Sequence, residues 1–274
     1  MKALNYAHSS HWSRVATLVD SSNSAVSKAL VESVVDQVGR QGVNNRVLDV
    51  AAGDGALVFA LASKCNTVVG IDFSEFAISK AREQALIQKR GNSAFVLMDA
   101  SSLKFPDHSF DAVTFLRSFW VFPDISQILY EVHRVLALDG SLFIQIWGGA
   151  AQCSLISFGT QILGKYIPEL CIPKNITGPF DYTEASLEEI LLKHGFCNLT
   201  VKNYKAKIQI RGIDDYWEHF CGLAGTAYLA FTQQPKSIRD AIEAEWKSRW
   251  EGHLLRGGAE RLLLEWKMCI AQRG

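Results

Sequence analysis

The sequence has no excess of either charge, because 28 Lys and Arg residues balance 28 Asp and Glu residues in a chain of 274. Without uncompensated positive charge there is little electrostatic attraction to a phosphate backbone, so we expect no nucleic-acid partner. No uncharged apolar stretch approaches the ~20 residues of a membrane-spanning helix, so we expect no membrane span. The first residues lack the apolar core of a secretory signal, which predicts a cytoplasmic protein.

Cysteine motifs are also missing. The six cysteines are scattered, and no two of them form a C-x-x-C pair. Outside an oxidising compartment such residues act as small buried apolar side chains, so we expect neither a disulfide framework nor a zinc site. His8 and His11 are spaced by one helical turn, but two ligands alone do not make a metal site, and we expect no metal.

The composition is that of an ordinary globular protein, with 48% hydrophobic and 20% charged residues. The length allows one large domain, or a domain with a cap. The chain contains no internal repeat and no low-complexity linker, so we predict a single domain over residues 1–274. Its expected parts are N-terminal helices at 1–42, a ligand-binding core at 43–148, and a cap with C-terminal substrate-side elements at 149–274.

Short apolar strands alternate with helical segments in the first half of the chain. Apolar periodicity and turn residues predict strands at 46–50, 67–71, 94–98, 110–115 and 141–147, and helices at 22–39, up to Leu61, from Ser74 to about 90, and at 124–138. Asp139-Gly140 is expected to end the last of these helices. A parallel crossover needs a dozen or more residues, so this alternation predicts an α/β fold whose parallel sheet is covered on both faces.

The pattern changes after Trp147. A loop-rich stretch with three prolines is followed by a predicted helix at 185–194, a strand at 198–210, helical segments at 214–230 and 236–251, and a last strand at 260–272. Ile238, Ile242, Trp246 and Trp250 recur every four residues, which indicates one apolar helix face packed within the cap. We therefore expect a partly helical cap.

The most informative segment is Val47-Leu-Asp-Val-Ala-Ala-Gly-Asp-Gly55. A strand ends at Asp49 and the chain turns through Ala51, Gly53 and Gly55 into a helix. Glycines let the backbone approach a ligand closely, and the N-terminus of a helix offers unpaired N–H groups. Such a turn suits a nucleotide or an adenosyl compound.

A second acidic residue supports this interpretation. Asp72 ends the next predicted strand, 19 positions after Gly53. A carboxylate at the tip of the second strand, about 20 residues beyond the glycine turn, accepts hydrogen bonds from ribose hydroxyls in open α/β sheets. Ser74 is better placed to cap the following helix, so Asp72 remains available for ribose.

These segments resemble the class I S-adenosylmethionine-dependent methyltransferases. The turn is similar to the family's first motif, V-L-D-x-G-x-G-x-G, and Gly70-Ile-Asp-Phe-Ser and Met98-Asp-Ala-Ser are similar to its second and third strand motifs. The likeness continues through residues 105–113 and 131–140. Gly178-Pro-Phe and residues 192–196 resemble the branch of ubiquinone and menaquinone C-methyltransferases. The resemblance implies a Rossmann-like, mostly parallel seven-stranded sheet with an antiparallel last strand.

The resemblance also implies a function and a role for each matching residue. The expected function is transfer of a methyl group from S-adenosylmethionine to a small molecule. Asp49 and the Ala51–Gly55 turn would hold the methionine part, Asp72 the ribose, Phe73 one face of adenine, and Asp99 the adenine amino group beside Ala100. Leu116 and Arg117 would lie near the transferring methyl. Glu131 and Arg134 match a structural motif.

One residue departs from the family pattern. Ala51 stands where the first glycine is usual. An alanine methyl fits there if the backbone φ angle is negative, so Ala51 weakens the inference of cofactor binding without excluding it. Asp54 is also less common than a small residue at its position, and its charge must point away from the carboxylate of the cofactor.

Methyl transfer from a sulfonium mainly requires alignment and exclusion of water, so no catalytic triad is expected. An amine, phenol or activated carbon would benefit from a base. The candidates are His11, Tyr182, Tyr228 and, first among them, His219. Aromatic residues are expected to line an apolar acceptor pocket and to attract the sulfonium through cation–π contacts. The predicted pocket residues are Trp12, Phe119, Trp120, Tyr182, Trp217 and Tyr228.

Other functions remain open at this point. A nicotinamide-dependent oxidoreductase shares the glycine turn and the acidic strand tip, but Val58 occupies the position of its third glycine. A non-catalytic S-adenosylmethionine-binding partner protein of the same fold is compatible with Ala51 and with the lack of an evident base. A soft acceptor such as a thiol or an arsenical is a further alternative, given four cysteines in the second half of the chain.

Overall fold

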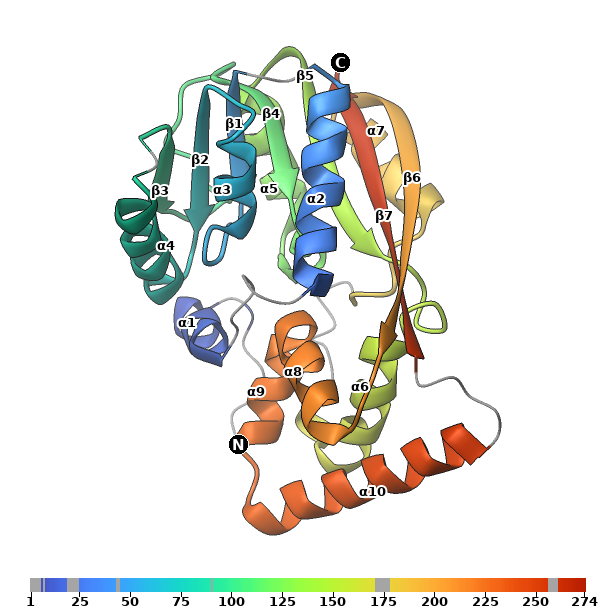
Figure 1. Ribbon diagram of the computed structural model, residues 1–274. Helices are drawn as coiled ribbons and strands as arrows, with labels where there is room; N and C mark the ends of the chain where they lie inside the picture. Colours follow the sequence, from blue (N-terminus) through green and yellow to red (C-terminus); the bar gives the residue numbers. More distant parts are fainter. Residues whose placement is uncertain are drawn as a thin grey trace.

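The computed structural model describes Tyr6 and residues 8–18, 25–42, 45–89, 91–170, 178–255 and 261–274. The described residues form one seven-stranded sheet in the order β3-β2-β1-β4-β5-β7-β6 (Figure 1). The strands are β1 (Arg46–Val50), β2 (Thr67–Asp72), β3 (Ser93–Leu97), β4 (Phe110–Phe115), β5 (Leu136–Trp147), β6 (Phe196–Gln209) and β7 (Arg261–Arg273). The strand order reverses direction between β1 and β4, which is where open α/β sheets bind ligands.

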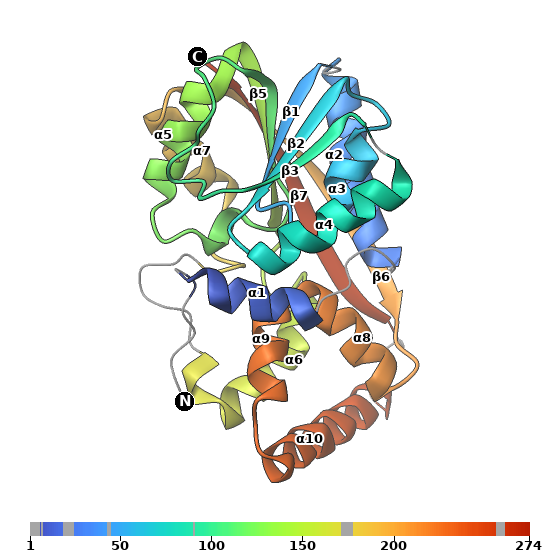
Figure 2. The same cartoon turned by 90° about the vertical axis from the view of Figure 1, so that its left-hand side faces the viewer.

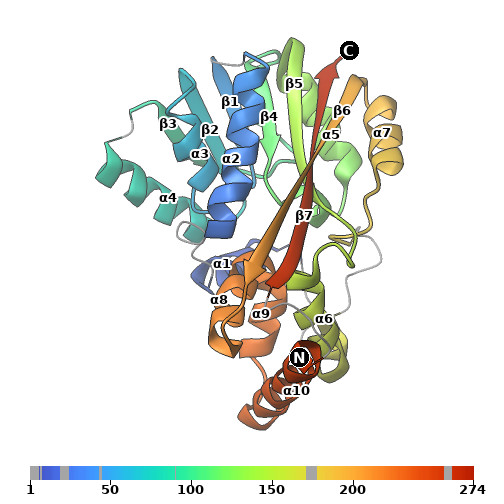
Figure 3. The same ribbon diagram turned by 45° about the vertical axis from the view of Figure 1, so that its right-hand side comes forward.

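The sheet is mostly parallel. Strands β1 to β5 pair in parallel, whereas β7 runs antiparallel between β5 and β6, with Trp147 opposite Trp266 and Trp266 opposite Tyr204. The expected Rossmann-like sheet with an antiparallel last strand is thereby confirmed. Strands β6 and β7 extend beyond the rest of the sheet toward the helices below it (Figure 3).

Helices cover both faces of the sheet (Figures 1 and 2). The helices α2 (Ala25–Arg40), α3 (Ala56–Leu61) and α4 (Glu75–Gln88) lie on one face, and α5 (Ile125–Val135) and α7 (Glu184–Lys193) on the other. Side chains alternate between these layers because successive strand residues point to opposite faces. In β1, Leu48 and Val50 pack in the core with α5 and α7, while Val47 packs with α2 and α3.

A helical cap lies below the carboxyl ends of the parallel strands (Figure 1). It contains α6 (Ser154–Tyr166), the short helix η2 (Pro168–Leu170), α8 (Ile213–Leu223), α9 (Gly225–Thr232) and α10 (Lys236–Leu255). Tyr216, Phe220 and Trp246 are fully buried in its core. The predicted stripe on α10 packs into this core, with Ile242, Trp246 and Trp250 buried. The helix α1 (Ser9–Leu18) contacts both α4 and α9, and so joins the sheet to the cap (Figure 2).

Two sequence predictions about the end of the helix before β5 are wrong. The helix expected to reach residue 138 ends at Val135, because Leu136 is fully buried and pairs with Phe110 at the start of β5. Asp139, with φ +60°, and Gly140 do not end the helix but lie within β5, at an irregularity in its pairing with β4.

The stretch after Trp147 is not only loop, because it contains α6. This helix buries Leu155, Ile156, Ile162 and Leu163 against the cap, so tertiary packing compensates for its two glycines. Gly159 is required by that packing, since a side chain there would overlap the Tyr216 hydroxyl. None of the described helices is both long and apolar enough to cross a bilayer.

Candidate active site

A cavity of about 780 Å³ is lined by residues at the carboxyl ends of the strands and by residues of the cap. Its walls come from residues after β1, β2, β3 and β4, from α1, and from the cap. This volume falls within the usual range of small-molecule sites, roughly 300–1,000 Å³. The cavity is therefore large enough for a ligand at the strand ends together with a second molecule under the cap.

The turn after β1 is wound tightly by three residues with positive φ. Ala51, Gly53 and Gly55 have φ angles of +59°, +57° and +87°. A Cβ atom on Gly55 would lie 2.6 Å from Cζ of Phe95, so a side chain there would push the turn away from the sheet. Gly53, in contrast, has open space beside its Cα, and it lines the cavity. The turn thus exposes the backbone of Gly53 to the cavity.

Ala51 does not have the negative φ at which an alanine methyl fits without strain. Its φ of +59° places the alanine in the left-handed region, which costs a residue with a Cβ atom roughly 1–2 kcal/mol. The reason is the tight reversal of the chain, in which the amide of Ala52 donates to the carbonyl of Ile71 on β2 at 2.9 Å. The hydrogen bond to β2 stabilises the strained backbone conformation of Ala51.

Asp72 is fixed at the tip of β2 by main-chain amides. Its Oδ2 accepts from the amide of Gly53 and its Oδ1 from the amide of Ser74, both at 2.8 Å. Burial raises the pKa of Asp72, although these amides oppose that effect. The carboxylate lines the cavity. Ser74 caps α4 through the amide of Ala77, as predicted, so Asp72 retains acceptor capacity for a ligand.

Asp49 is a buried acid of the site whose pKa is strongly raised. Its Oδ1 accepts from the hydroxyl of Thr114 at 2.7 Å, whereas Oδ2 is buried without a partner among the described residues. Burial raises the pKa of Asp49 to about 7, the Thr114 bond lowers it, and the nearby Asp72 raises it further. An unpaired buried carboxylate oxygen is unusual and calls for a donor from a ligand.

The sequence family described as "Methyltransferase domain" matches residues 48–144, which include the β1 turn, Asp72 and the strand ends around the cavity. Among curated relatives, the chain is similar to a ubiquinone/menaquinone biosynthesis C-methyltransferase of Rickettsia bellii, with 28% identity over 72% of this chain and 87% of that protein. It is 40% identical to a demethylmenaquinone methyltransferase of Thermus thermophilus over 36% of this chain, but that match spans only 46% of the relative.

Among solved structures, a Bacillus protein named YcgJ has the same fold, with a TM-score of 0.61 and 17% identity over 90% of this chain and 98% of that one. The family match and the relatives agree with the geometry of the turn. Residues 48–144 thus match the methyltransferase domain family, and the chain is similar to class I S-adenosylmethionine-dependent methyltransferases.

The fold brings most of the predicted cofactor residues to one cavity. Those that line it are Asp49, Ala51, Gly53, Asp72, Phe73, Asp99, Ala100, Leu116 and Arg117. Gly55 does not line the cavity and instead forms the tight end of the turn against Phe95. Asp99 is exposed, and its Oδ1 accepts from the amide of Ser101 at 2.8 Å, which leaves its other oxygen for a ligand.

Only two of the six predicted pocket aromatics lie at the cavity, namely Trp12 and Trp120. Tyr6 joins them, and its ring centroid lies 5.5 Å from that of Trp12 and 6.0 Å from that of Trp120. Sequence reasoning missed Tyr6, since nothing in its local pattern distinguishes it. The indole Nε1 of Trp12 donates a hydrogen bond to the carbonyl of Tyr6 at 2.8 Å, which fixes the Trp12 side chain.

The other four pocket candidates do not reach the cavity. Phe119 is fully buried against Phe115 and Tyr182 in the sheet core. Trp217 stacks on Phe231 within the cap, at 4.8 Å between centroids, and Tyr228 packs beside them. None of these side chains lines the cavity, so we leave them out of the proposed acceptor pocket.

The structure does not place the candidate bases at the cavity either. His219 lies on α8 with Nε2 3.8 Å from Asp215, and it is not a lining residue. His11 is buried outside the lining, with Nε2 3.4 Å from the hydroxyl of Thr226. Burial, followed by the nearby Arg14, lowers the pKa of His11 to about 4. A neutral imidazole of this kind is a weak proton acceptor.

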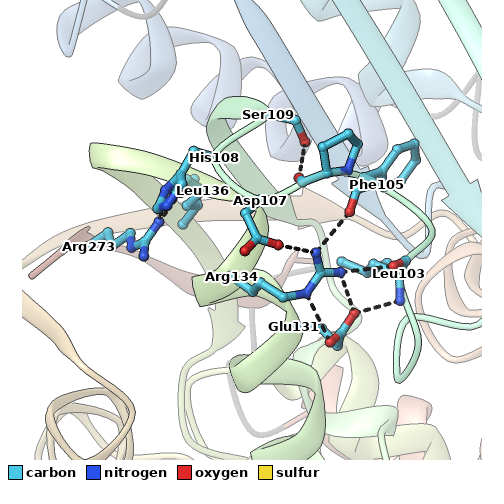
Figure 4. Close-up of polar contacts among 10 residues, drawn as sticks. Leu103, Phe105, Asp107, His108, Ser109, Glu131, Arg134, Leu136 and Arg273 are labelled. Carbon is cyan, nitrogen blue, oxygen red and sulfur yellow. Dashed lines mark hydrogen bonds and ion pairs between the residues drawn. The ribbon is translucent and has the colours of Figure 1, made fainter.

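Glu131 and Arg134 form an ion pair on α5, as expected for structural residues (Figure 4). Arg134 donates to both carboxylate oxygens of Glu131, to the carbonyls of Leu103 and Phe105, and to Asp107. Glu131 in turn accepts from the amide of Leu103 at 2.8 Å. The pair therefore fixes the segment after β3, which carries Asp99 and Ala100.

Replacing Ala51 with glycine should stabilise the protein. The substitution removes the strain of the left-handed conformation. Glycine also raises the conformational entropy of the unfolded chain, which offsets part of this effect. The expected net gain in the free energy of unfolding is about 0.5–1 kcal/mol. Urea denaturation measures it. Ala52→Gly is the matched control, because Ala52 is buried and lacks a positive φ, so this change should lower stability. Equal losses in both variants would contradict the assignment of strain to Ala51.

Proposed function

We propose that the protein transfers the methyl group of S-adenosylmethionine to a small, mainly apolar acceptor bound under the cap. The observation that carries this proposal is the distribution of residue types around one cavity. The lining residues at the strand ends are acidic and rich in main-chain groups, whereas those under the cap are mainly apolar, and we call these two parts the halves of the cavity. The first half suits an adenosyl sulfonium, and the second suits an acceptor that is excluded from water.

The acidic half fits the cofactor. The unpaired Oδ2 of Asp49 is a ready acceptor for the ammonium group of the methionine part. Asp72, already oriented by two amides, would accept from the ribose hydroxyls, and Asp99 from the adenine amino group. Phe73 would cover one face of adenine. The open space beside Gly53 supports close approach of the methionine part to the turn.

The acceptor half is built mainly from side chains that sequence reasoning did not identify. Trp147, Ile156, Leu170, Phe180 and Leu223 come from the end of β5 and from the cap. Apolar walls of this kind favour an acceptor with a hydrocarbon or aromatic body through burial of apolar surface. Trp12, Trp120 and Tyr6 form an aromatic wall beside this half, and they would also favour a nearby sulfonium.

The bound cofactor supplies an activated methyl group on a positively charged sulfur. The protein's own contribution is to align the acceptor with that methyl and to exclude water. The cap performs the exclusion, since α6, α8 and α9 cover the cavity below the strand ends. No histidine is among the described lining residues, so proton removal by a protein imidazole is not part of this proposal.

Calorimetry with S-adenosylhomocysteine and with NADH tests the cofactor assignment. We expect S-adenosylhomocysteine to bind in the micromolar range, while NADH produces no heat of binding because Val58 prevents the close helix packing of a dinucleotide site. Binding of NADH alone would overturn the proposal.

Methyl transfer is tested with labelled S-adenosylmethionine and a panel of apolar hydroxy, amino and thiol compounds. Binding without turnover on any of them would favour a non-catalytic partner protein instead.

A further inference from the structure

Arg117 is a cation at the boundary between the two halves of the cavity. It lies two residues after the end of β4, has a φ angle of +58°, and lines the cavity. Its Nη1 donates to the carbonyl of Gly222 on α8 at 2.7 Å, which links the sheet to the cap. Its Nε is buried and has no hydrogen-bond partner among the described residues. The guanidinium therefore retains unused donors at the cavity.

No carboxylate of the described residues lies within ion-pair distance of this guanidinium. Burial lowers the pKa of Arg117, and the charge of Asp54 opposes that effect from farther away. Asp54 lies 4.0 Å from Lys80, on α4. A guanidinium stays protonated in proteins, so the cavity holds a buried positive charge without a direct counterion. Such a charge costs several kcal/mol unless an anion accompanies it.

We propose that the acceptor is an apolar molecule bearing one carboxylate, and that Arg117 binds this carboxylate and sets the acceptor specificity. This inference rests on the proposed function. The planar fork of a guanidinium matches a carboxylate, and the apolar cap side chains accommodate the rest of the molecule. A phosphate is disfavoured, because its second charge would face Asp49, Asp54 and Asp72 across the same cavity.

The position of Arg117 also orients the acceptor. Its carboxylate end would lie where β4 meets Gly222, and its apolar body would extend along Leu223 and Ala224 under the cap. The ion pair would be shielded from bulk water by the cap, where charge-assisted hydrogen bonds are strong. Arg117 is thus a specificity-determining residue, and it takes no part in proton transfer.

The test uses the full-length protein saturated with S-adenosylhomocysteine. Three probes are titrated into it, 2-naphthoate, 2-naphthamide and 2-naphthyl phosphate, which share one ring system and differ only in the polar group. Calorimetry should show that the wild-type protein binds 2-naphthoate at least tenfold more tightly than the other two. Arg117→Met should remove this preference, and Arg117→Lys should keep part of it. The matched control is Arg82→Met, because Arg82 also donates to a main-chain carbonyl, that of Phe95 at 3.0 Å, but does not line the cavity.

The outcomes separate this inference from the cofactor assignment. Absence of S-adenosylhomocysteine binding in the wild type overturns the proposed function itself. If the cofactor product binds but the wild type does not prefer 2-naphthoate, the acceptor inference is wrong. It is also wrong if Arg117→Met weakens S-adenosylhomocysteine binding tenfold and leaves the naphthoate preference intact, since Arg117 would then hold the carboxylate of the cofactor. Loss of the preference with normal S-adenosylhomocysteine binding supports the inference, and shows that the variant is folded.

Discussion

Asp72→Ala should weaken binding of S-adenosylhomocysteine by roughly 100-fold, or about 3 kcal/mol, as measured by calorimetry. Two losses combine in this variant. The charge-assisted bonds to the ribose hydroxyls disappear, and the amides of Gly53 and Ser74 lose the oxygens that they contact at 2.8 Å. The second loss loosens the turn after β1, so the remaining cofactor contacts are also less well organised.

Asp111→Ala is the matched control for this experiment. Asp111 also accepts a main-chain amide through a carboxylate oxygen, that of Arg46 at 2.8 Å, but it does not line the cavity. We expect its affinity for S-adenosylhomocysteine to stay within twofold of the wild type. A change within error in Asp72→Ala, in a protein that remains folded by circular dichroism, would remove Asp72 from the ribose site.

Asp49→Asn should change stability and cofactor binding in opposite directions. The pKa of Asp49 is raised to about 7 in the folded protein by burial, so an ionised carboxylate there destabilises the fold at pH 8. The neutral amide removes this cost, and we expect the cofactor-free variant to gain on the order of 2 kcal/mol at pH 8. The same change should weaken S-adenosylhomocysteine binding at least tenfold, because the acceptor for the ammonium group loses its charge.

The pH dependence of the wild type follows from the same group. A folded pKa near 7, above the ordinary carboxyl value of 3.8, means that the folded state holds its proton more tightly than the unfolded state. The contribution of Asp49 to stability is therefore greatest below pH 4 and is lost as the pH rises toward 7. Cofactor binding needs the ionised form, so affinity should be constant above pH 7 and should fall below it.

Thermal denaturation and calorimetry between pH 5.5 and pH 8.5 measure both effects. In Asp49→Asn the fall in cofactor affinity below pH 7 should disappear, together with the loss of stability on going to high pH. Thr114→Val provides a comparison, because it removes the donor to Oδ1 and should raise the pKa of Asp49 further. If Asp49→Asn is less stable than the wild type at pH 8 and binds S-adenosylhomocysteine normally, the role proposed for Asp49 is wrong.

Local sequence was sufficient for the parts of the site that depend on strand ends. Asp49, Gly53 and Asp72 could be placed because a buried strand, a tight turn and a helix follow one another within a few residues. The carboxyl ends of parallel strands meet at one edge of the sheet, so the ends of β1 and β2 form one surface there. The stripe on α10 was likewise predictable, since a period of 3.6 residues determines which side chains share a face.

The aromatic wall of Tyr6, Trp12 and Trp120 shows that the local sequence pattern does not determine which aromatic side chains face the cavity. Phe119 and Trp120 are neighbours in the short helix after β4, yet Phe119 is fully buried in the sheet core and Trp120 lines the cavity. Tyr6 reaches the same cavity because α1 packs between α4 and α9. Which of two adjacent aromatic side chains faces a ligand depends on the orientation of one short turn relative to the cap.

The sequence by itself determined the alternation of strands and helices, the glycine turn, and the acids at the strand tips, because each of these arises from residues close together in the chain. Only the tertiary structure decided the left-handed conformation of Ala51, the helix α6, and the position of Arg117 against Gly222. Each of these is stabilised by residues far apart in sequence, through β2, the cap core and α8 respectively. Packing and burial, rather than local propensity, set their free energies.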